Sequence, residues 1–297
     1  MLIALLVPLG ITSLLFTIFL VRAAIMKRAV PGGEAMVLGA ITNFFDTLGI
    51  GSFATTMAWF KFRNLVPDRL MPPTMLVGHS LPTIAQAVIY LILLGVLVDP
   101  VLLVGCMIAL LMGGLVGVPL VARASAWMIQ LVVGVALVLA AILYAMTNLH
   151  MMPGGGTAAS LPMTLTIIAI AANFVFGVLL NFGVGHYAPS LIMLSLMGLD
   201  PKLCFPIMAG GGALTIAGAG SRHISMGQID LRIVIGMAIG GIPAVLVAAF
   251  LVKSMSLEML RWLVIVVVIY AAAMMFRAAW TGRRDGKTAP VIAPVTT

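Results

Sequence analysis

Apolar runs of 18 or more residues recur along the whole length of this 297-residue chain. A helix of about 20 apolar residues spans the hydrocarbon core of a bilayer and satisfies its backbone polar groups internally. Only 8% of the residues are charged, whereas ordinary soluble domains carry about 25%. The sequence therefore predicts an all-α polytopic membrane protein with the lipid bilayer as its surroundings.

Two of the apolar runs are interrupted by the same pattern of glycines. The stretch Gly49-Ile50-Gly51-Ser52-Phe53-Ala54 aligns with Gly183-Val184-Gly185-His186-Tyr187-Ala188, and Pro67 aligns with Pro201 at the same offset of 134 positions. Glycine lets the backbone leave helical geometry. In hydrocarbon, an opened backbone persists only where it is buried in protein or lines a wet cavity. We therefore predict a duplication with a broken helix at the corresponding place in each repeat, which is typical of transporter binding sites.

The predicted organisation is an N-terminal helix followed by two repeats and a tail. The boundaries are residues 1–27 for the N-terminal transmembrane helix, 28–148 for the first repeat, 149–161 for the linker, 162–280 for the second repeat and 281–297 for a flexible cytoplasmic tail. Within the first repeat, residues 73–98 are expected to form one long apolar helix.

Basic residues indicate how the broken segments 34–63 and 163–199 lie in the membrane. If each is a re-entrant hairpin, each repeat has three crossings, so the two repeats are inverted relative to each other. Thirteen of the sixteen lysines and arginines then fall on the inside, as membrane orientation requires. If each segment crosses fully instead, the basic cluster Lys61–Arg69 falls opposite Lys27 and Arg28. We predict seven crossings and two hairpins, with eight or nine crossings as the alternative.

Inverted hairpins bring their glycine turns together near the midplane of the bilayer. The second short helix of each hairpin is expected to begin near Ser52 and near His186. Helix N-termini expose free N–H groups and a partial positive charge, so two facing N-termini form a site for a small anion. The alternative is that the glycines only allow close contacts between helices. The expected substrate-binding residues are Gly49, Gly51, Ser52, Phe53, His79, Gln86, Asn181, Gly183, Gly185, His186 and Tyr187.

Two ionisable residues inside the apolar runs each have two open interpretations. Asp46 precedes the first glycine turn, and an intramembrane carboxylate is a candidate for a functional site. It either couples transport to protons or is paired with a cation such as Arg63. His79 shares a helix face with Gln86. It either serves the anion or a proton, or is bonded to a neighbouring backbone carbonyl.

The remaining polar candidates are asparagines and one basic pair. Asn43, Asn173 and Asn181 are expected either to satisfy the opened backbone or to contact the ligand. Arg222 and His223 end a helix at the predicted inner surface. They either set the orientation of the helix or attract anions at the inner mouth.

Several other functions are excluded by composition and motif. The net charge of +8 comes from residues at the ends of apolar runs, so it indicates membrane orientation and gives no support to nucleic-acid binding. Cys106 and Cys204 lie in different repeats, and no paired Cys or His ligands occur, so neither a disulfide framework nor a metal site is expected. The chain has no Gly-x-x-x-x-Gly-Lys phosphate loop. We predict no catalytic residues, no cofactor and no enzymatic activity.

The glycine turns and the segments after them resemble the sulfite exporter TauE/SafE family of small membrane permeases. Members have two repeats, each opening with a glycine-rich turn like Gly49-Ile50-Gly51 and Gly183-Val184-Gly185. The stretch Gly198-Leu199-Asp200-Pro201-Lys202 resembles the following loop, and Phe205-Pro206-Ile207-Met208 and His223 with Gly227-Gln228-Ile229-Asp230 resemble the rest of the second repeat. This chain departs from the family pattern where Ser52-Phe53 and His186-Tyr187 replace glycines. The resemblance implies transport of sulfite, sulfoacetate, thiosulfate or a related anion without choosing among them.

Together these observations predict a secondary transporter of the cell membrane that exports a small anion. The resemblance implies a sulfur oxyanion or organosulfonate such as sulfite or sulfoacetate, and Asp46 adds proton coupling as an option. A passive anion channel and a non-transporting membrane subunit of a partner enzyme are the alternatives. The sequence leaves the oligomeric state open, with a homodimer among the options.

Overall fold

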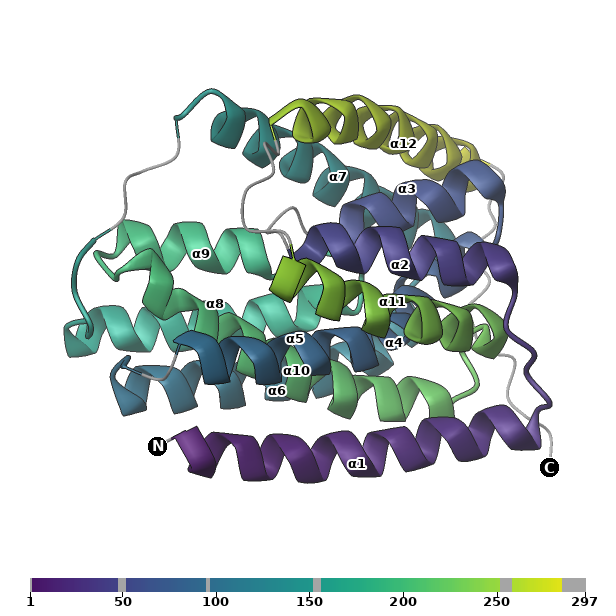
Figure 1. The fold of residues 1–297 in the computed structure, drawn as a ribbon. Coiled ribbons are helices and arrows are strands. Elements are labelled where there is room, and N and C mark those ends of the chain that lie inside the picture. Colours follow the sequence, from purple (N-terminus) through teal and green to yellow (C-terminus); the bar gives the residue numbers. More distant parts are fainter. Residues whose placement is uncertain (1, 48–51, 95–96, 152–155, 252–257, 285–297) are drawn as a thin grey trace.

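A computed structural model of the chain describes residues 2–47, 52–94, 97–151, 156–251 and 258–284 (Figure 1). The described residues are helical throughout, apart from turns and one isolated bridge between Ala158 and Leu199. The elements are α1 (Leu2–Met26), α2 (Gly33–Thr47), α3 (Phe53–Arg63), the short 3-10 helix η1 (Asp68–Leu70), α4 (Met71–Gly78), α5 (Ser80–Leu94), α6 (Pro100–Arg123), α7 (Ala126–Asn148), α8 (Met163–Leu180), α9 (Tyr187–Leu196), α10 (Pro201–Ser225), α11 (Leu231–Leu251) and α12 (Glu258–Arg284).

Seven helical stretches in the described part of the chain are long and apolar enough to cross a membrane. They are Leu5–Met26, Asp68–Ile92, Pro100–Arg123, Ala126–Asn148, Met163–Leu180, Leu203–Ser225 and Leu231–Ala249. The chain is therefore a multi-pass, all-helical membrane protein, as predicted. Met163–Leu180 is α8, which the sequence assigned to a hairpin limb, so its length and composition also allow a full crossing.

The first broken segment folds as a hairpin whose two outer ends lie together. Nε of Arg63 at the end of α3 lies 2.7 Å from Oε1 of Glu34 at the start of α2. The indole nitrogen of Trp59 donates to the same carboxylate oxygen at 3.2 Å. The start of α2 and the end of α3 thus lie at one end of the bundle; that the segment is re-entrant in the membrane stays a prediction.

The second broken segment also starts and finishes at one end. The N–H of Asp200, after α9, donates to the carbonyl of Ala158, before α8, at 2.9 Å, and Ala158 and Leu199 form a parallel bridge. The N–H of Asp99 donates to the carbonyl of Ala159 at 3.0 Å. The turn between α5 and α6 therefore lies at this same end.

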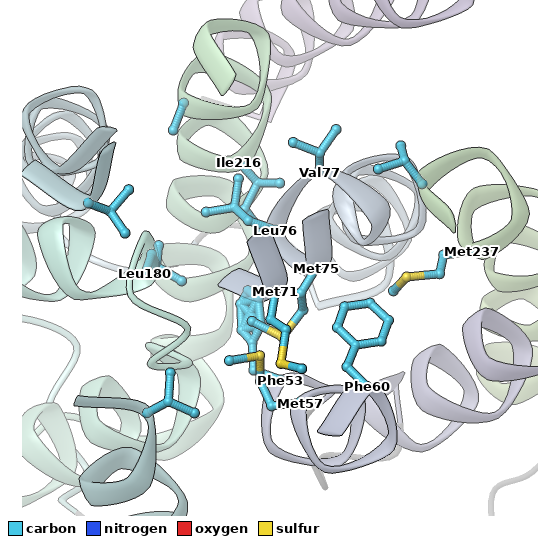
Figure 2. Close-up of a cluster of buried hydrophobic side chains, with 14 of the residues drawn as sticks. Phe53, Met57, Phe60, Met71, Met75, Leu76, Val77, Leu180, Ile216 and Met237 are labelled. Atoms are coloured by element: carbon cyan, nitrogen blue, oxygen red, sulfur yellow. The ribbon is translucent and has the colours of Figure 1, made fainter. Parts of the chain in front are cut away.

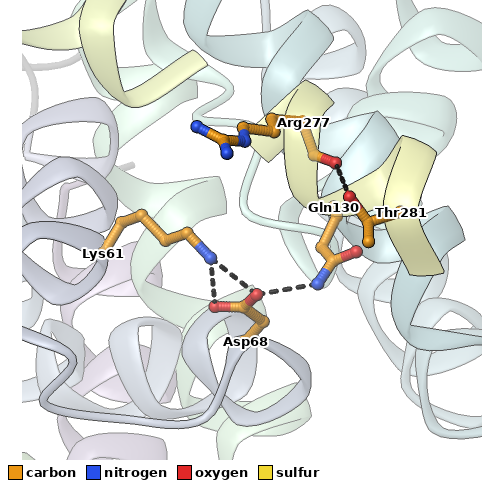
Figure 3. Close-up of polar contacts among 5 residues, drawn as sticks. All are labelled: Lys61, Asp68, Gln130, Arg277 and Thr281. Carbon is orange, nitrogen blue, oxygen red and sulfur yellow. Dashed lines mark hydrogen bonds and ion pairs between the residues drawn. The ribbon is translucent and has the colours of Figure 1, made fainter. Parts of the chain in front are cut away.

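The opposite end of the bundle, called the basic end below, carries the outer ends of the first hairpin. Nζ of Lys61 lies 2.7 Å from Oδ2 of Asp68, which also accepts from the side-chain amide of Gln130 at 2.7 Å (Figure 3). The N–H of Asp230, between α10 and α11, donates to Oγ1 of Thr74 in α4 at 3.0 Å. These contacts bring together the end of α3 and the starts of α4, α7 and α11, so Lys61 and Arg63 lie near the start of α11, which carries Arg232.

Helices of the first half of the chain pack along helices of the second half. α2 packs along α11, α8 packs along α6, and α7 packs along α12 (Figure 1). Glycines make the first two contacts close. A Cβ atom at Gly39 would lie 2.3 Å from the carbonyl oxygen of Met237, and one at Gly113 would lie 1.9 Å from that of Phe174. If α2 corresponds to α8, α6 to α11 and α7 to α12, each of these contacts has its counterpart in the other half of the chain. This supports the duplication, and the inversion of the two repeats stays a prediction.

One predicted helix is divided and one expected tail begins later. Residues 73–98 were expected to form one helix; within the helical stretch Asp68–Ile92, the single turn residue His79 separates α4, which ends at Gly78, from α5, which begins at Ser80. Pro82 explains the break, because it has no N–H to donate to Gly78 and its ring crowds that carbonyl. Near the C-terminus, α12 continues to Arg284, so the first positions of the expected tail, residues 281–297, are helical. The rest of the tail lies outside the described residues.

Candidate substrate site at the hairpin tips

The glycine turn of the second hairpin lies against α3 of the first hairpin. A Cβ atom at Gly185 would lie 3.5 Å from Cβ of Phe53, the first residue of α3. A Cβ atom at Gly183 would lie 3.1 Å from the terminal methyl of Met57, also in α3. The predicted residues Gly49 and Gly51 lie outside the described residues. The start of α3 and the turn before α9 are therefore neighbours, although 130 or so positions separate them in the sequence.

Each tip presents the N-terminus of a short helix. Ser52 is the N-cap of α3 and His186 is the N-cap of α9, and neither side chain makes a capping hydrogen bond. The first-turn N–H groups of a helix have no partners within it. Two such helix starts in contact concentrate backbone donors and partial positive charge in one place.

Asp46, in the last turn of α2, lies beside Ser52 at the start of α3. Its carboxylate accepts hydrogen bonds from the side chain and from the backbone N–H of Ser52. Arg63, the cation considered as its partner, pairs with Glu34 at the basic end instead. The carboxyl group of Asp46 thus occupies part of the positive helix end where an anion would bind.

His79 connects the first hairpin to the helix break between α4 and α5. It is buried, with Nδ1 2.9 Å from Oδ1 of Asn43 and Nε2 2.9 Å from Oγ1 of Thr56. The amide nitrogen of Asn43 donates to the carbonyl of Gly39 at 2.7 Å, so Oδ1 is the acceptor for an N–H of His79. Nε2 then accepts from the Thr56 hydroxyl. Both ring nitrogens have partners in the protein, so His79 positions α2 and α3.

His186 fastens the second tip to α10. Its Nε2 lies 3.0 Å from the carbonyl oxygen of Met208, and its ring meets the Tyr187 ring edge-on at 4.8 Å. Gly212 makes room for both rings, since a Cβ atom there would lie 2.7 Å from Cε1 of His186. The start of α9 is thereby held against the middle of α10.

Asn181 and His223 form a buried pair next to the second glycine turn. The amide nitrogen of Asn181 donates to the carbonyl of Gly114 at 2.9 Å, and its Oδ1 lies 2.8 Å from Nε2 of His223. His223 is fully buried. Arg222 is exposed and donates to the carbonyl of Leu115 at 3.0 Å. The structure therefore separates the pair expected at the inner mouth: only Arg222 faces the surface.

Other predicted polar residues also have partners. The amide nitrogen of Asn173 donates at 2.8 Å to the carbonyl of Ala169, which lies inside the continuous helix α8 and not in an opened backbone. Gln86 is buried and hydrogen-bonded to the side chain of Tyr90, whose hydroxyl donates to the carbonyl of Thr47. Tyr90 thus connects α5 to the last residue of α2, next to Asp46.

Two buried hydroxyls near the second tip were missed by the sequence reasoning. In the described residues, Oγ of Ser190, Oγ1 of Thr215 and the hydroxyl of Tyr187 are buried without a hydrogen-bond partner. Ser190 follows Tyr187 by one helical turn, and Thr215 follows Gly212 by one turn, so each shares a face with a residue of the tip. This spacing in the sequence could have identified both hydroxyls as candidates for the site. Buried polar groups normally have partners, so these three are candidates to bind a ligand.

Apolar side chains surround the first tip. Figure 2 shows Phe53 and Met57 of α3 beside Met71 and Met75 of α4, with Leu180 at the end of α8 close by. Met57 and Met75 both approach Gly183. Methionine side chains are flexible and adapt to irregular spaces. The tip contact is thus closed by side chains that can change conformation.

Comparison with known proteins tests the resemblance seen in the sequence. The family model described as "Sulfite exporter TauE/SafE" matches residues 165–297. This confirms the TauE/SafE resemblance for the second repeat, including the tip at Gly183–Tyr187. TauE/SafE is a family of membrane transporters and not of enzymes, and it suggests transport of an anion or sulfite. No curated protein and no solved structure matches the chain.

Proposed function

We propose that this protein is a secondary transporter of the cell membrane that exports a small anion, which binds between the starts of α3 and α9. The TauE/SafE match supports a sulfur oxyanion or organosulfonate such as sulfite or sulfoacetate. The observation that carries the proposal is the contact of two helix starts, at Phe53 and at Gly185, inside a membrane-spanning bundle.

The charge distribution supports backbone recognition of the anion. No lysine or arginine occurs in residues 29–60 or 124–201, which contain both hairpin tips. A fixed cation in the middle of a bilayer is costly, whereas helix starts supply positive potential without one. The unpartnered hydroxyls of Tyr187, Ser190 and Thr215 add donors beside these helix starts. Neutral donors of this kind hold an anion and still release it, as a carrier must.

Asp46 supplies a route to proton coupling. Its carboxylate already accepts from Ser52 at the start of α3. An anion bound at the same helix start repels the ionised carboxylate. Anion binding is therefore favoured when Asp46 takes up a proton or moves away from Ser52. Either event ties the occupancy of the site to the state of Asp46.

Flux through proteoliposomes tests the function directly. Purified full-length protein should accumulate labelled sulfite against its concentration gradient when a proton gradient is imposed. A passive anion channel would move sulfite only down its electrochemical gradient. A membrane subunit of a partner enzyme would move none. Either result would overturn the proposed transport mechanism.

A matched pair of serine variants tests the position of the site. Ser190→Ala removes an unpartnered hydroxyl beside the second tip, whereas Ser221→Ala removes a hydroxyl that is bonded to its own helix through the carbonyl of Ala217. We expect Ser190→Ala to weaken anion binding by about 1.5–3 kcal/mol, the value of a hydrogen bond to a charged group. Ser221→Ala should leave it unchanged in isothermal titration. Equal affinities in both variants would place the anion elsewhere.

A further inference from the structure

A small hollow lies at the basic end, apart from the hairpin tips. It has a volume of about 280 Å³ and lies between the end of α1, the η1 helix and the start of α11. Lys27, Arg28 and Arg232 line it together with Asp230 and the apolar side chains of Leu70 and Ile229. The hollow thus combines three cations with an apolar wall.

The cations of the hollow form no ion pair among the described residues, whereas its carboxylate, Asp230, already accepts a hydrogen bond. Oδ1 of Asp230 accepts from the backbone N–H of Arg232 at 3.0 Å and so caps the start of α11. The ion pairs found among the described residues join Lys61 to Asp68 and Arg63 to Glu34. None of them involves the cations of the hollow, which leaves an excess of positive charge there.

The backbone after α1 turns sharply to present these cations. Arg28 has a φ of 48°, in the left-handed region, and its N–H donates to the carbonyl of Ile25 at 3.1 Å. A residue with a side chain is disfavoured there relative to glycine. The next turn, at Gly227, comes close to Lys27: a Cβ atom at Gly227 would lie 3.8 Å from its Nζ. The end of α1 and the α10–α11 turn therefore form one surface.

An exposed apolar surface begins directly before the cations in the sequence. Ile18, Val21, Ile25 and Met26 of α1 line a shallow groove of about 430 Å³, and Ile25 and Met26 are 71% and 73% exposed. α1 lies at the outside of the bundle (Figure 1). The turns of α1 that lead to the basic hollow therefore expose an apolar surface at the outside of the bundle.

We propose that Lys27, Arg28 and Arg232 bind the phosphate of an anionic phospholipid whose acyl chains lie along the last turns of α1. A headgroup phosphate carries a negative charge at the membrane surface, and basic pockets between membrane helices recognise it. The adjoining apolar groove selects a lipid over free phosphate, which would leave that groove empty. The bound lipid joins α1 to the start of α11. This inference does not depend on the proposed transport function.

Thermal-shift titration of the full-length protein in uncharged detergent tests the lipid and needs no variant. Phosphatidylglycerol should raise the melting temperature saturably. Phosphatidylcholine and inorganic phosphate should raise it much less at equal concentrations. An equal effect of phosphatidylcholine would show that the headgroup charge is not read, and an equal effect of inorganic phosphate would show a free-anion site. Either outcome overturns the proposal.

Two double variants test the place of binding. Lys27→Ala/Arg232→Ala removes cations of the hollow, and Arg69→Ala/Arg123→Ala removes the same charge from exposed residues elsewhere at the basic end. The first should bind phosphatidylglycerol about 25-fold more weakly, since each basic residue near an anionic headgroup contributes roughly a factor of five. The control should bind as the unaltered protein does. An equal loss in both variants would mean general charge attraction without a site.

Discussion

The two glycines of the second tip should respond differently to the same small change. Gly183 has a φ of 88°, whereas Gly185 has no positive φ. A left-handed backbone suits glycine, because a side chain there crowds the following carbonyl. We therefore compare Gly183→Ala with Gly185→Ala, each of which adds one methyl group to the turn.

The expected magnitudes follow from backbone conformation and available space. At Gly183 the left-handed conformation costs a residue with a side chain about 1–2 kcal/mol. The new Cβ would also lie 3.1 Å from the terminal methyl of Met57, which must shift by a few tenths of an ångström. At Gly185 the nearest atoms belong to Phe53 and lie at 3.5–3.7 Å, an ordinary contact. Stability of Gly185→Ala should stay within about 0.5 kcal/mol of the unaltered protein.

The two variants should differ in the opposite way in anion binding: Gly185→Ala should affect affinity directly, whereas Gly183→Ala should affect stability first. Gly185→Ala keeps the fold but places a methyl group between the turn and the start of α3, where the anion is proposed to bind. Its affinity for sulfite should fall without loss of thermal stability. Gly183→Ala should lose stability first, and any loss of binding should follow from that. Unfolding in detergent and isothermal titration measure the two quantities on the same preparations.

Two results would refute this reasoning. If Gly185→Ala binds sulfite with unchanged affinity, the anion does not approach the gap beside Phe53. If Gly183→Ala is as stable as Gly185→Ala, the left-handed turn is not required by the fold. Both variants should first elute as single species, so that aggregation is not mistaken for weak binding.

Three further predictions concern packing, ion pairs and coupling. Gly113→Ala should destabilise the protein by about 1–3 kcal/mol, because its Cβ would lie 1.9 Å from a carbonyl oxygen of α8. The control Gly10→Ala, with open space around it, should have no effect on the melting temperature. Asp68→Asn should lower the melting temperature more than Glu34→Gln, because each carboxylate accepts from two partners but Asp68 is half-buried while the Arg63–Glu34 pair is exposed to solvent; equal shifts would contradict this. Asp46→Asn should remove the dependence of sulfite flux on a proton gradient while equilibrium exchange continues, and a variant that still responds to the gradient would remove Asp46 from the coupling mechanism.

The sequence alone was sufficient to predict an all-helical protein that crosses the membrane several times. Apolar runs predicted the membrane helices because hydrocarbon admits few other structures. The repeated glycine pattern at residues 49–54 and 183–188 predicted two broken segments, and the outer ends of each do lie together. The positions of lysine and arginine predicted that thirteen of these sixteen residues lie on the inner side of the membrane, and this orientation stays a prediction. Each of these signals is local and can be read without knowing which helices touch.

The partners of the buried polar side chains were decided only by the tertiary structure. His79 takes Asn43 and Thr56, and His223 takes Asn181 at a distance of 42 positions in the chain. Sequence reasoning placed His223 at a surface, since it follows Arg222. The packing of α10 against α6, with Asn181 at the end of α8 as its partner, buries it instead. No local pattern records such a choice, because membrane helices are apolar on all sides and their hydrophobic periodicity does not tell which face meets a neighbour.

Close glycine contacts determine those faces. Gly39 meets the backbone of α11, and Gly113 meets the backbone of α8. Small residues let helices approach closely where the hydrophobic effect gives no preference between a helix and lipid. A glycine in the sequence shows that some backbone can come near, but the identity of that backbone depends on the whole arrangement. The sequence thus determined where the chain can open, and the tertiary structure decided which groups the opened tips meet.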